Sequence, residues 1–138
     1  MTHSIQPTAT KIKGDHKCIL SMILAVDMSV QKLNKTECKL KQIRGNHINR
    51  NICEAADEYL MKNNKLVSIA KELVDRLVST EVMFQTNEIN TPQPKLIEQF
   101  RQEIEILDWM HFEVTKEYFS FINKNFETKI IRLAPMAA

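Results

Sequence analysis

The side chains best placed to do chemistry are Asp108 and His111, which lie three residues apart. On a helix this spacing puts a carboxylate and an imidazole on one face, as in the carboxylate–histidine motifs of di-iron helical bundles. A di-iron centre also needs a second such pair and two further carboxylates. None of the acidic residues between positions 54 and 81 has a histidine three residues later. We therefore expect His111 to be a core histidine, and we expect no metal or cofactor.

Other catalytic chemistry has no recognisable motif in this chain. The only two glycines, Gly14 and Gly45, stand far apart, which excludes a glycine-rich phosphate-binding loop and a G-x-S-x-G nucleophile elbow. The sequence therefore predicts a protein that is not an enzyme. The alternative is a helical-bundle metal or small-ligand enzyme centred on Asp108 and His111.

The cysteines and the apolar segments indicate the compartment. Cys18, Cys38 and Cys53 are an odd set without a CxxC pair, so we expect reduced thiols and no zinc site. No apolar signal segment precedes position 18, and the densest apolar stretch, 18–26, is shorter than the about 20 residues of a membrane span. A cytoplasmic protein without a membrane partner is expected. The alternative is a secreted helical signalling protein with a glycosylated Asn34 and a Cys38–Cys53 disulfide.

The composition predicts the fold class. The chain of 138 residues has two glycines and four prolines, far below the about 12% that these residues contribute to average proteins. Apolar residues recur at steps of three and four, which is typical of helices. We expect an all-α fold: an antiparallel, up-down bundle of three long helices, or four if the second breaks near Asn63. Residues 1–14 and 133–138 are predicted to be tails and residues 15–132 the bundle domain.

Capping residues predict where the helices begin and end. Asp15 is expected to cap the first helix, and Gly45 to end it in a left-handed conformation. The second helix follows at once and reaches about residue 85. Thr91 and Pro92 are expected to start the third helix after a loop, and this helix is expected to end at about residue 128.

The first helix has an apolar face marked by Ile19, Val26 and Leu33. Leu20, Leu24 and Met22 widen this stripe. The sequence therefore predicts that the first half of this helix is deeply buried.

The third helix carries a second apolar stripe. At 100° per residue, Trp109 points about 160° away from the seam through Leu107 and His111. A peripheral helix of a three-helix monomer buries one face, so the second stripe is covered either by a fourth helix or the tails, or by another chain. We expect a surface for another protein or for a second copy, formed by Trp109, Phe112, Phe119 and Phe126.

Positive charge is concentrated in the first part of the chain. Residues 1–50 carry a net charge of +6 and residues 51–138 a net charge of −4. A basic surface can attract nucleic acid, but this one lacks aromatic residues on which bases could stack. Nucleic acid is therefore not the expected partner, and a nucleic-acid binder is kept as an alternative. The basic surface consists of Lys32, Lys35, Lys39, Lys41, Arg44 and Arg50.

These observations favour a non-catalytic helical-bundle interaction module, such as an adaptor, chaperone, inhibitor or regulator. Its expected binding surface is the aromatic face of the third helix, which concentrates the residue types that dominate interface energetics. Its expected partner is another protein or a second copy of the chain.

Overall fold

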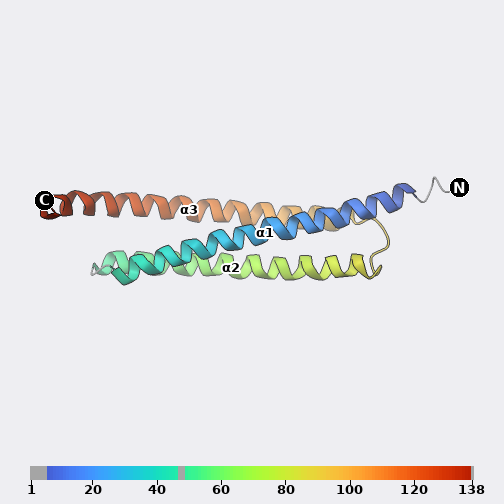
Figure 1. Ribbon diagram of the computed structural model, residues 1–138, viewed down its shortest axis with the longest axis horizontal. Coiled ribbons are helices and arrows are strands. Elements are labelled where there is room, and N and C mark those ends of the chain that lie inside the picture. The colour runs from blue at the N-terminus through green and yellow to red at the C-terminus, as the bar shows by residue number, and fades with distance from the viewer. Residues whose placement is uncertain (1–5, 47–48, 138) are drawn as a thin grey trace.

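The computed structural model describes the backbone of residues 6–46 and 49–137, and the side chains within 8–46 and 49–124. These described residues form three helices, which together make an elongated rod (Figure 1). Their bounds are α1 (Gln6–Asn46), α2 (Arg50–Gln85) and α3 (Pro94–Ala137). The all-α prediction is confirmed. Helix α2 continues without a break through Asn63, so the bundle has three helices and not four.

Helices α1 and α2 form an antiparallel pair. His16, near the beginning of α1, pairs with Glu81, near the end of α2, with 3.1 Å between imidazole Nε2 and carboxylate Oε1. Arg44, near the end of α1, pairs with Asp57, near the beginning of α2. The His16 ring also stacks on Phe84 with 5.4 Å between ring centroids. Residue numbers therefore run in opposite directions along the two helices.

Helix α3 returns antiparallel to α2 and is held to it by two ion pairs. The Arg76 guanidinium lies 2.6 Å from the Glu103 carboxylate, and the Lys62 ammonium lies 3.0 Å from the Glu117 carboxylate. Helices α1 and α2 pack much more closely with each other than either packs against α3. The α1–α2 hairpin is therefore the tighter unit, and α3 lies along it.

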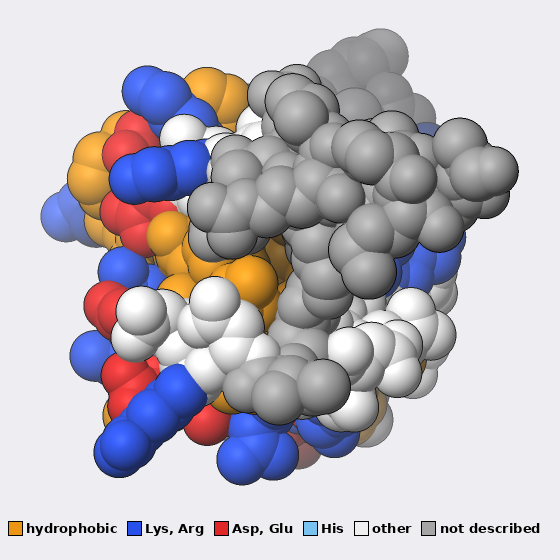
Figure 2. All heavy atoms as spheres, turned by 90° about the vertical axis from the view of Figure 1, so that its left-hand side faces the viewer, with side chains coloured by type: hydrophobic (Ala, Val, Ile, Leu, Met, Phe, Trp, Pro, Cys, Tyr) orange, Lys and Arg blue, Asp and Glu red, His pale blue; other side chains and the backbone are white. Residues whose placement is uncertain are grey.

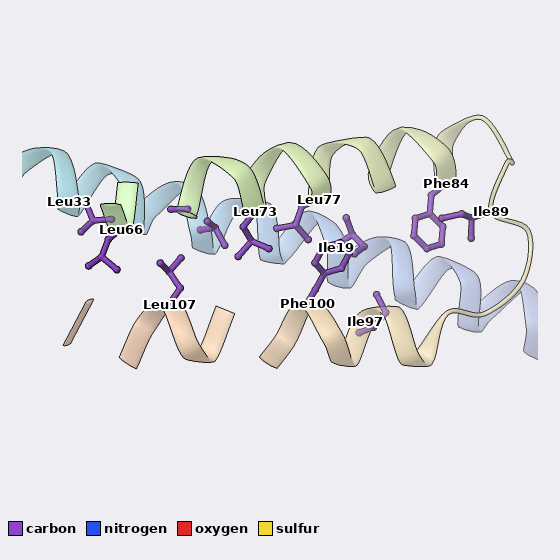
Figure 3. Close-up of a cluster of buried hydrophobic side chains, with 12 residues drawn as sticks. Ile19, Leu33, Leu66, Leu73, Leu77, Phe84, Ile89, Ile97, Phe100 and Leu107 are labelled. Atoms are coloured by element: carbon purple, nitrogen blue, oxygen red, sulfur yellow. The ribbon is translucent and has the colours of Figure 1, made fainter. Parts of the chain in front are cut away.

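The core is a line of apolar side chains that recurs every seven residues along α1: Ile19, Val26, Leu33 and Leu40, each at most 1% exposed. A seven-residue repeat keeps these positions facing a partner helix along a left-handed supercoil. Small buried residues in α2 let α1 approach closely, because interaxial distance depends on the side chains at the contact. The side chains that α2 and α3 contribute include Leu66, Ala70, Leu73, Leu77, Phe100 and Leu107 (Figure 3).

One buried polar side chain, Asn63, interrupts the apolar core. It is completely buried, and its Nδ2 donates a hydrogen bond of 2.8 Å to the carbonyl oxygen of Leu33 in α1. Its Oδ1 is buried without a hydrogen-bond partner. Buried polar residues of this kind restrict the register of paired helices at a cost in stability.

Replacing Asn63 by leucine should raise the free energy of unfolding by about 1 kcal/mol. The substitution removes the orphaned amide oxygen, whose desolvation costs about 1–3 kcal/mol, and loses one hydrogen bond worth about 1 kcal/mol. The Leu33 carbonyl keeps its hydrogen bond within α1. Urea unfolding of wild type and Asn63→Leu measures the change, and a variant less stable than wild type would contradict the expectation.

Helices α1 and α3 are longer than the sequence predicted. Helix α1 begins at Gln6 and α3 continues to Ala137, so the described residues of both predicted tails, 6–14 and 133–137, are helical. Pro7 lies in the first turn of α1, where its missing N–H breaks no hydrogen bond. Residues 129–132, beyond the expected end of α3, contain no glycine or proline to stop the helix.

Three capping predictions were wrong. Thr91 and Pro92 do not start α3, which begins at Pro94. Helix α1 continues through Gly45 to Asn46, and neither glycine has a positive φ. Asp15 lies inside α1, and its carboxylate accepts a hydrogen bond of 2.7 Å from the backbone N–H of Gln93. Gln93 directly precedes Pro94, so Asp15 caps the start of α3 and not of α1. This contact also places the beginnings of α1 and α3 side by side.

The prediction that Leu20 and Leu24 are deeply buried was also wrong. Their exposed fractions are 42% and 67%, and that of Met28, one turn further along, is 59%. Ile19 and Val26 fill the position that faces the other helices. A helix with only two neighbours buries one side, so these three residues form an exposed stripe on α1.

Candidate functional site

The outer face of α3 exposes large aromatic side chains. The exposed fractions of Trp109, Phe112 and Phe119 are 64%, 62% and 55%, and that of Ile106 is 57%. We call Ile106, Trp109, Phe112, Lys116 and Phe119 the outer stripe of α3. Phe126, the fourth aromatic residue that the sequence predicted for this surface, lies outside the residues whose side chains are described.

The geometry of the helix explains why this stripe is exposed. Leu107 is 1% exposed and Trp109 is 64% exposed, although they are two residues apart, because two residues correspond to a rotation of about 200°. Phe100 and Tyr118 lie on the side of Leu107 and are buried. Helices α1 and α2 cover that side only, so the apolar residues on the other side meet solvent.

The outer stripe carries unpaired charges. Lys116 lies within it, and Glu105 and Glu113 flank Trp109 at one turn on either side. None of these three side chains forms an ion pair within the part of the chain whose side chains are described. Acidic residues of α3 that face α2 instead pair with lysine or arginine. The charges on the outer stripe are therefore available to a partner.

Two shallow depressions adjoin the outer stripe. One, of about 320 Å³, is lined by Ile106 and Trp109 with polar neighbours. The other is a groove of about 600 Å³ between α2 and α3, with Tyr59 and Phe121 among its lining residues and Lys116 at its edge with the stripe. The two rings lie 5.4 Å apart. Figure 2 looks along the rod from the end at which α1 is followed by α2. It shows acidic and basic side chains along one side, with hydrophobic side chains exposed beside them.

Some side chains of the predicted basic surface form ion pairs with carboxylates, and others do not. Each of its six residues is exposed. Lys41, Arg44 and Arg50 pair with Glu37, Asp57 and Glu54 respectively. Among the described side chains, the remaining three have no ion-pair partner; they are Lys32, Lys35 and Lys39.

His111 on α3 is half-buried, whereas Asp108 is exposed. Burial lowers the pKa of His111, the nearby Lys32 ammonium lowers it further, and the Asp108 carboxylate partly opposes this shift. Within the described residues, no group of three or more His, Cys, Asp or Glu side chains comes together in a way that could hold a metal ion. His111 is therefore half-buried and does not belong to the buried core, in contrast to the predicted core histidine.

The free energy of unfolding should fall as the pH falls below about 6.5, the usual pKa of histidine, and His111→Gln should remove part of this fall. Because the pKa of His111 is lowered in the folded chain, the unfolded chain binds the proton more readily. The stability contributed by the neutral imidazole is present above the unfolded pKa and is lost as the pH approaches the folded pKa. Urea unfolding of both proteins at about pH 7.5 and about pH 5.5 measures the difference. An identical fall in both would contradict the assignment.

The cysteines are all thiols, and the predicted Cys38–Cys53 disulfide of the secreted alternative is not formed. The Cys53 thiol instead lies 3.6 Å from the carbonyl oxygen of Arg44, across the α1–α2 turn. Across the described residues, no helix is both long and apolar enough to cross a membrane.

Comparisons with known protein families, curated proteins and solved structures found no match for this chain. Sequence reasoning identified the three aromatic members of the outer stripe but missed Ile106, and it did not include Glu105 and Glu113. Ile106 precedes Trp109 by three residues, so the helical spacing that defined the stripe could have found it.

Proposed function

We propose that this protein is a non-catalytic, cytoplasmic interaction module, acting as an adaptor, chaperone, inhibitor or regulator, and that it binds a protein through the outer stripe of α3. The observation that carries the proposal is the exposure of Trp109, Phe112 and Phe119 at 55–64% on the side of α3 that faces away from the core. Exposed apolar patches of this kind mark interaction sites, and tryptophan is enriched among the residues that dominate binding energy.

The charged neighbours of these rings support the same surface. Lys116, Glu105 and Glu113 have no ion-pair partner among the described residues. Charges at the edge of an apolar patch give a partner orientation and specificity more than affinity. The surface thus combines apolar anchors with polar neighbours, as protein interfaces do.

A photo-crosslinking amino acid at position 116 tests this proposal in cells that produce the protein. The matched control carries the crosslinker at Lys71, which is exposed on α2. We expect a protein adduct from position 116 that is absent from position 71 and is lost in Trp109→Ala/Phe112→Ala. Identical adducts from the two positions, or adducts that survive the double substitution, would overturn the proposal.

A further inference from the structure

The order of charges along the outer stripe restricts what can cover it. Going along α3, Glu105 and Glu113 lie on either side of Trp109, and Lys116 lies between Phe112 and Phe119. All three charged side chains lack ion-pair partners within the described residues. A partner that brings a cation to Trp109 and an acidic environment to Lys116 would therefore complement these charges. The stripe itself contains both features, about two turns apart.

We propose that the occupant is a second copy of this chain, with the two α3 helices packed antiparallel along their outer stripes so that Lys116 of each copy lies over the partner's Trp109. This inference rests on the proposed function, because it names the partner of the same surface.

A two-fold axis passing between residues 112 and 113 produces this arrangement. Such isologous pairing is the commonest form of protein oligomer. It brings position 109 of one copy level with position 116 of the other, since successive residues rise by the same distance along both helices. The Lys116 ammonium then contacts the face of the partner's Trp109, and tryptophan is the best aromatic partner for a cation. Glu105 and Glu113 of the partner copy, one turn on either side of its Trp109, then place two carboxylates near the Lys116 ammonium.

A parallel pair would not have this complementarity. In it, Lys116 would face the partner's Lys116, and Glu105 would face the partner's Glu105. Like charges placed opposite each other in an interface weaken binding by roughly several kcal/mol. In the antiparallel pair Phe112 meets the partner's Phe112 across the axis, and Glu113 lies near the partner's Glu113. Each Glu113 also lies one turn from the partner's Lys116, which offsets this repulsion, whereas every charge of the stripe faces its own copy in the parallel pair. Charge complementarity therefore selects the antiparallel orientation.

The area of the stripe is sufficient for a dimer. An aromatic side chain buries about 150–250 Å² when fully covered. With 55–64% of their surface exposed, the three rings offer roughly 270–450 Å² per copy by the same measure. Two copies would bury about 540–900 Å² from the rings alone. Ile106 and the aliphatic stems of the flanking charged residues add to this area, so the upper end of the range reaches the about 1,000 Å² expected of a specific interface.

Distances between the two copies test the orientation directly. A nitroxide is attached to full-length protein through a ketone-bearing unnatural amino acid, which leaves the native cysteines unmodified, at Lys95 in one sample and at Asp108 in another. Double electron–electron resonance should give about 50 Å between the two labels at position 95 and less than about 25 Å at position 108, from the rise of about 1.5 Å per residue. Short distances at both positions would indicate a parallel pair, and no dipolar signal would indicate a monomer. Either result overturns the inference.

Analytical ultracentrifugation of Lys116→Glu tests the predicted contact. The substitution places a carboxylate against the partner's Trp109 and between two further carboxylates, so we expect the dimer dissociation constant to rise at least tenfold. Lys71→Glu changes the net charge equally on α2, outside the stripe, and should leave the dissociation constant unchanged. Equal effects of the two substitutions would overturn the inference.

The outcomes separate this inference from the proposed function. A monomeric protein whose position-116 crosslinker captures a different protein, in a manner that Trp109→Ala/Phe112→Ala abolishes, overturns the second copy as partner and keeps the interaction surface. Crosslinking that is independent of the stripe overturns the proposed function itself.

Discussion

Replacing Trp109 and Phe112 by alanine should weaken binding at the outer stripe of α3 by at least about 100-fold. Aromatic residues at the centre of an interface commonly contribute about 2 kcal/mol or more each. The two rings lie on the same helix face, so their losses are coupled and need not add fully. A combined loss of about 2.7 kcal/mol already corresponds to a 100-fold change in the dissociation constant. Sedimentation equilibrium over a range of protein concentrations measures it for the dimer.

The same double substitution should leave the free energy of unfolding within about 0.5 kcal/mol of wild type, because exposed side chains make few contacts within the folded chain. Urea unfolding at a protein concentration below the dimer dissociation constant measures this free energy on the monomer, without a contribution from self-association. If the free energy of unfolding drops by several kcal/mol, the rings belong to the core and the interface assignment is wrong.

A matched control distinguishes a specific surface from general hydrophobicity. Leu24 and Met28 on α1 are 67% and 59% exposed, close to the values for Trp109 and Phe112. Leu24→Ala/Met28→Ala therefore removes similarly exposed apolar side chains from another helix. We expect it to leave binding unchanged. Equal weakening by both double variants would show that any exposed apolar stripe on this rod promotes association.

The all-α fold and the antiparallel direction of the helices could be predicted because the core positions repeat, whereas the choice between three and four helices required the structure, in which α2 is unbroken. Ile19, Val26 and Leu33 in α1 are seven residues apart, and the register of α2 continues through Asn63 into Leu66 and beyond. A repeat of this length already specifies a helix that keeps one face toward its neighbours. The helix continues through the buried Asn63, whose side-chain amide donates a hydrogen bond to the carbonyl oxygen of Leu33 in the adjacent helix.

The ends of the helices could not be predicted in the same way. Asp15 has the chemistry of a capping residue, and the structure uses that chemistry for the backbone of Gln93, 78 positions later in the chain. Local sequence shows that a carboxylate can accept such a hydrogen bond, but only the packing of α1 beside α3 determines which N–H donates it. Gly45 likewise permits a left-handed turn without requiring one.

The candidate site was predictable in part. The aromatic stripe follows from angles around one helix, so its direction relative to Leu107 could be derived from spacing alone. Whether a second apolar stripe is covered depends on how many helices surround it. This is why Leu24 was predicted to be buried and is exposed. Charge pairing is equally non-local: Arg44 is neutralised by Asp57 of the next helix, which the composition of residues 1–50 could not show.

Replacing Leu107 by alanine should lower the free energy of unfolding by about 2–5 kcal/mol, the cost of removing a large aliphatic side chain from a packed core. Leu107 is 1% exposed and belongs to the core shared by the three helices. Because α3 packs less closely than the α1–α2 hairpin, we expect the lost stability to increase local unfolding of α3 more than that of α1 and α2. Amide hydrogen exchange in Leu107→Ala should therefore accelerate more in α3 than in α1 and α2.

Trp109→Ala provides the comparison for this last prediction, since it removes a larger side chain only two residues away. It should change neither the unfolding free energy by more than about 0.5 kcal/mol nor the exchange of α3 measured on the monomer. The opposite results at positions 107 and 109 would follow from a rotation of about 200° around one helix. Equal destabilisation by both substitutions would mean that α3 is buried on two sides within a single chain, which would leave no surface for a partner.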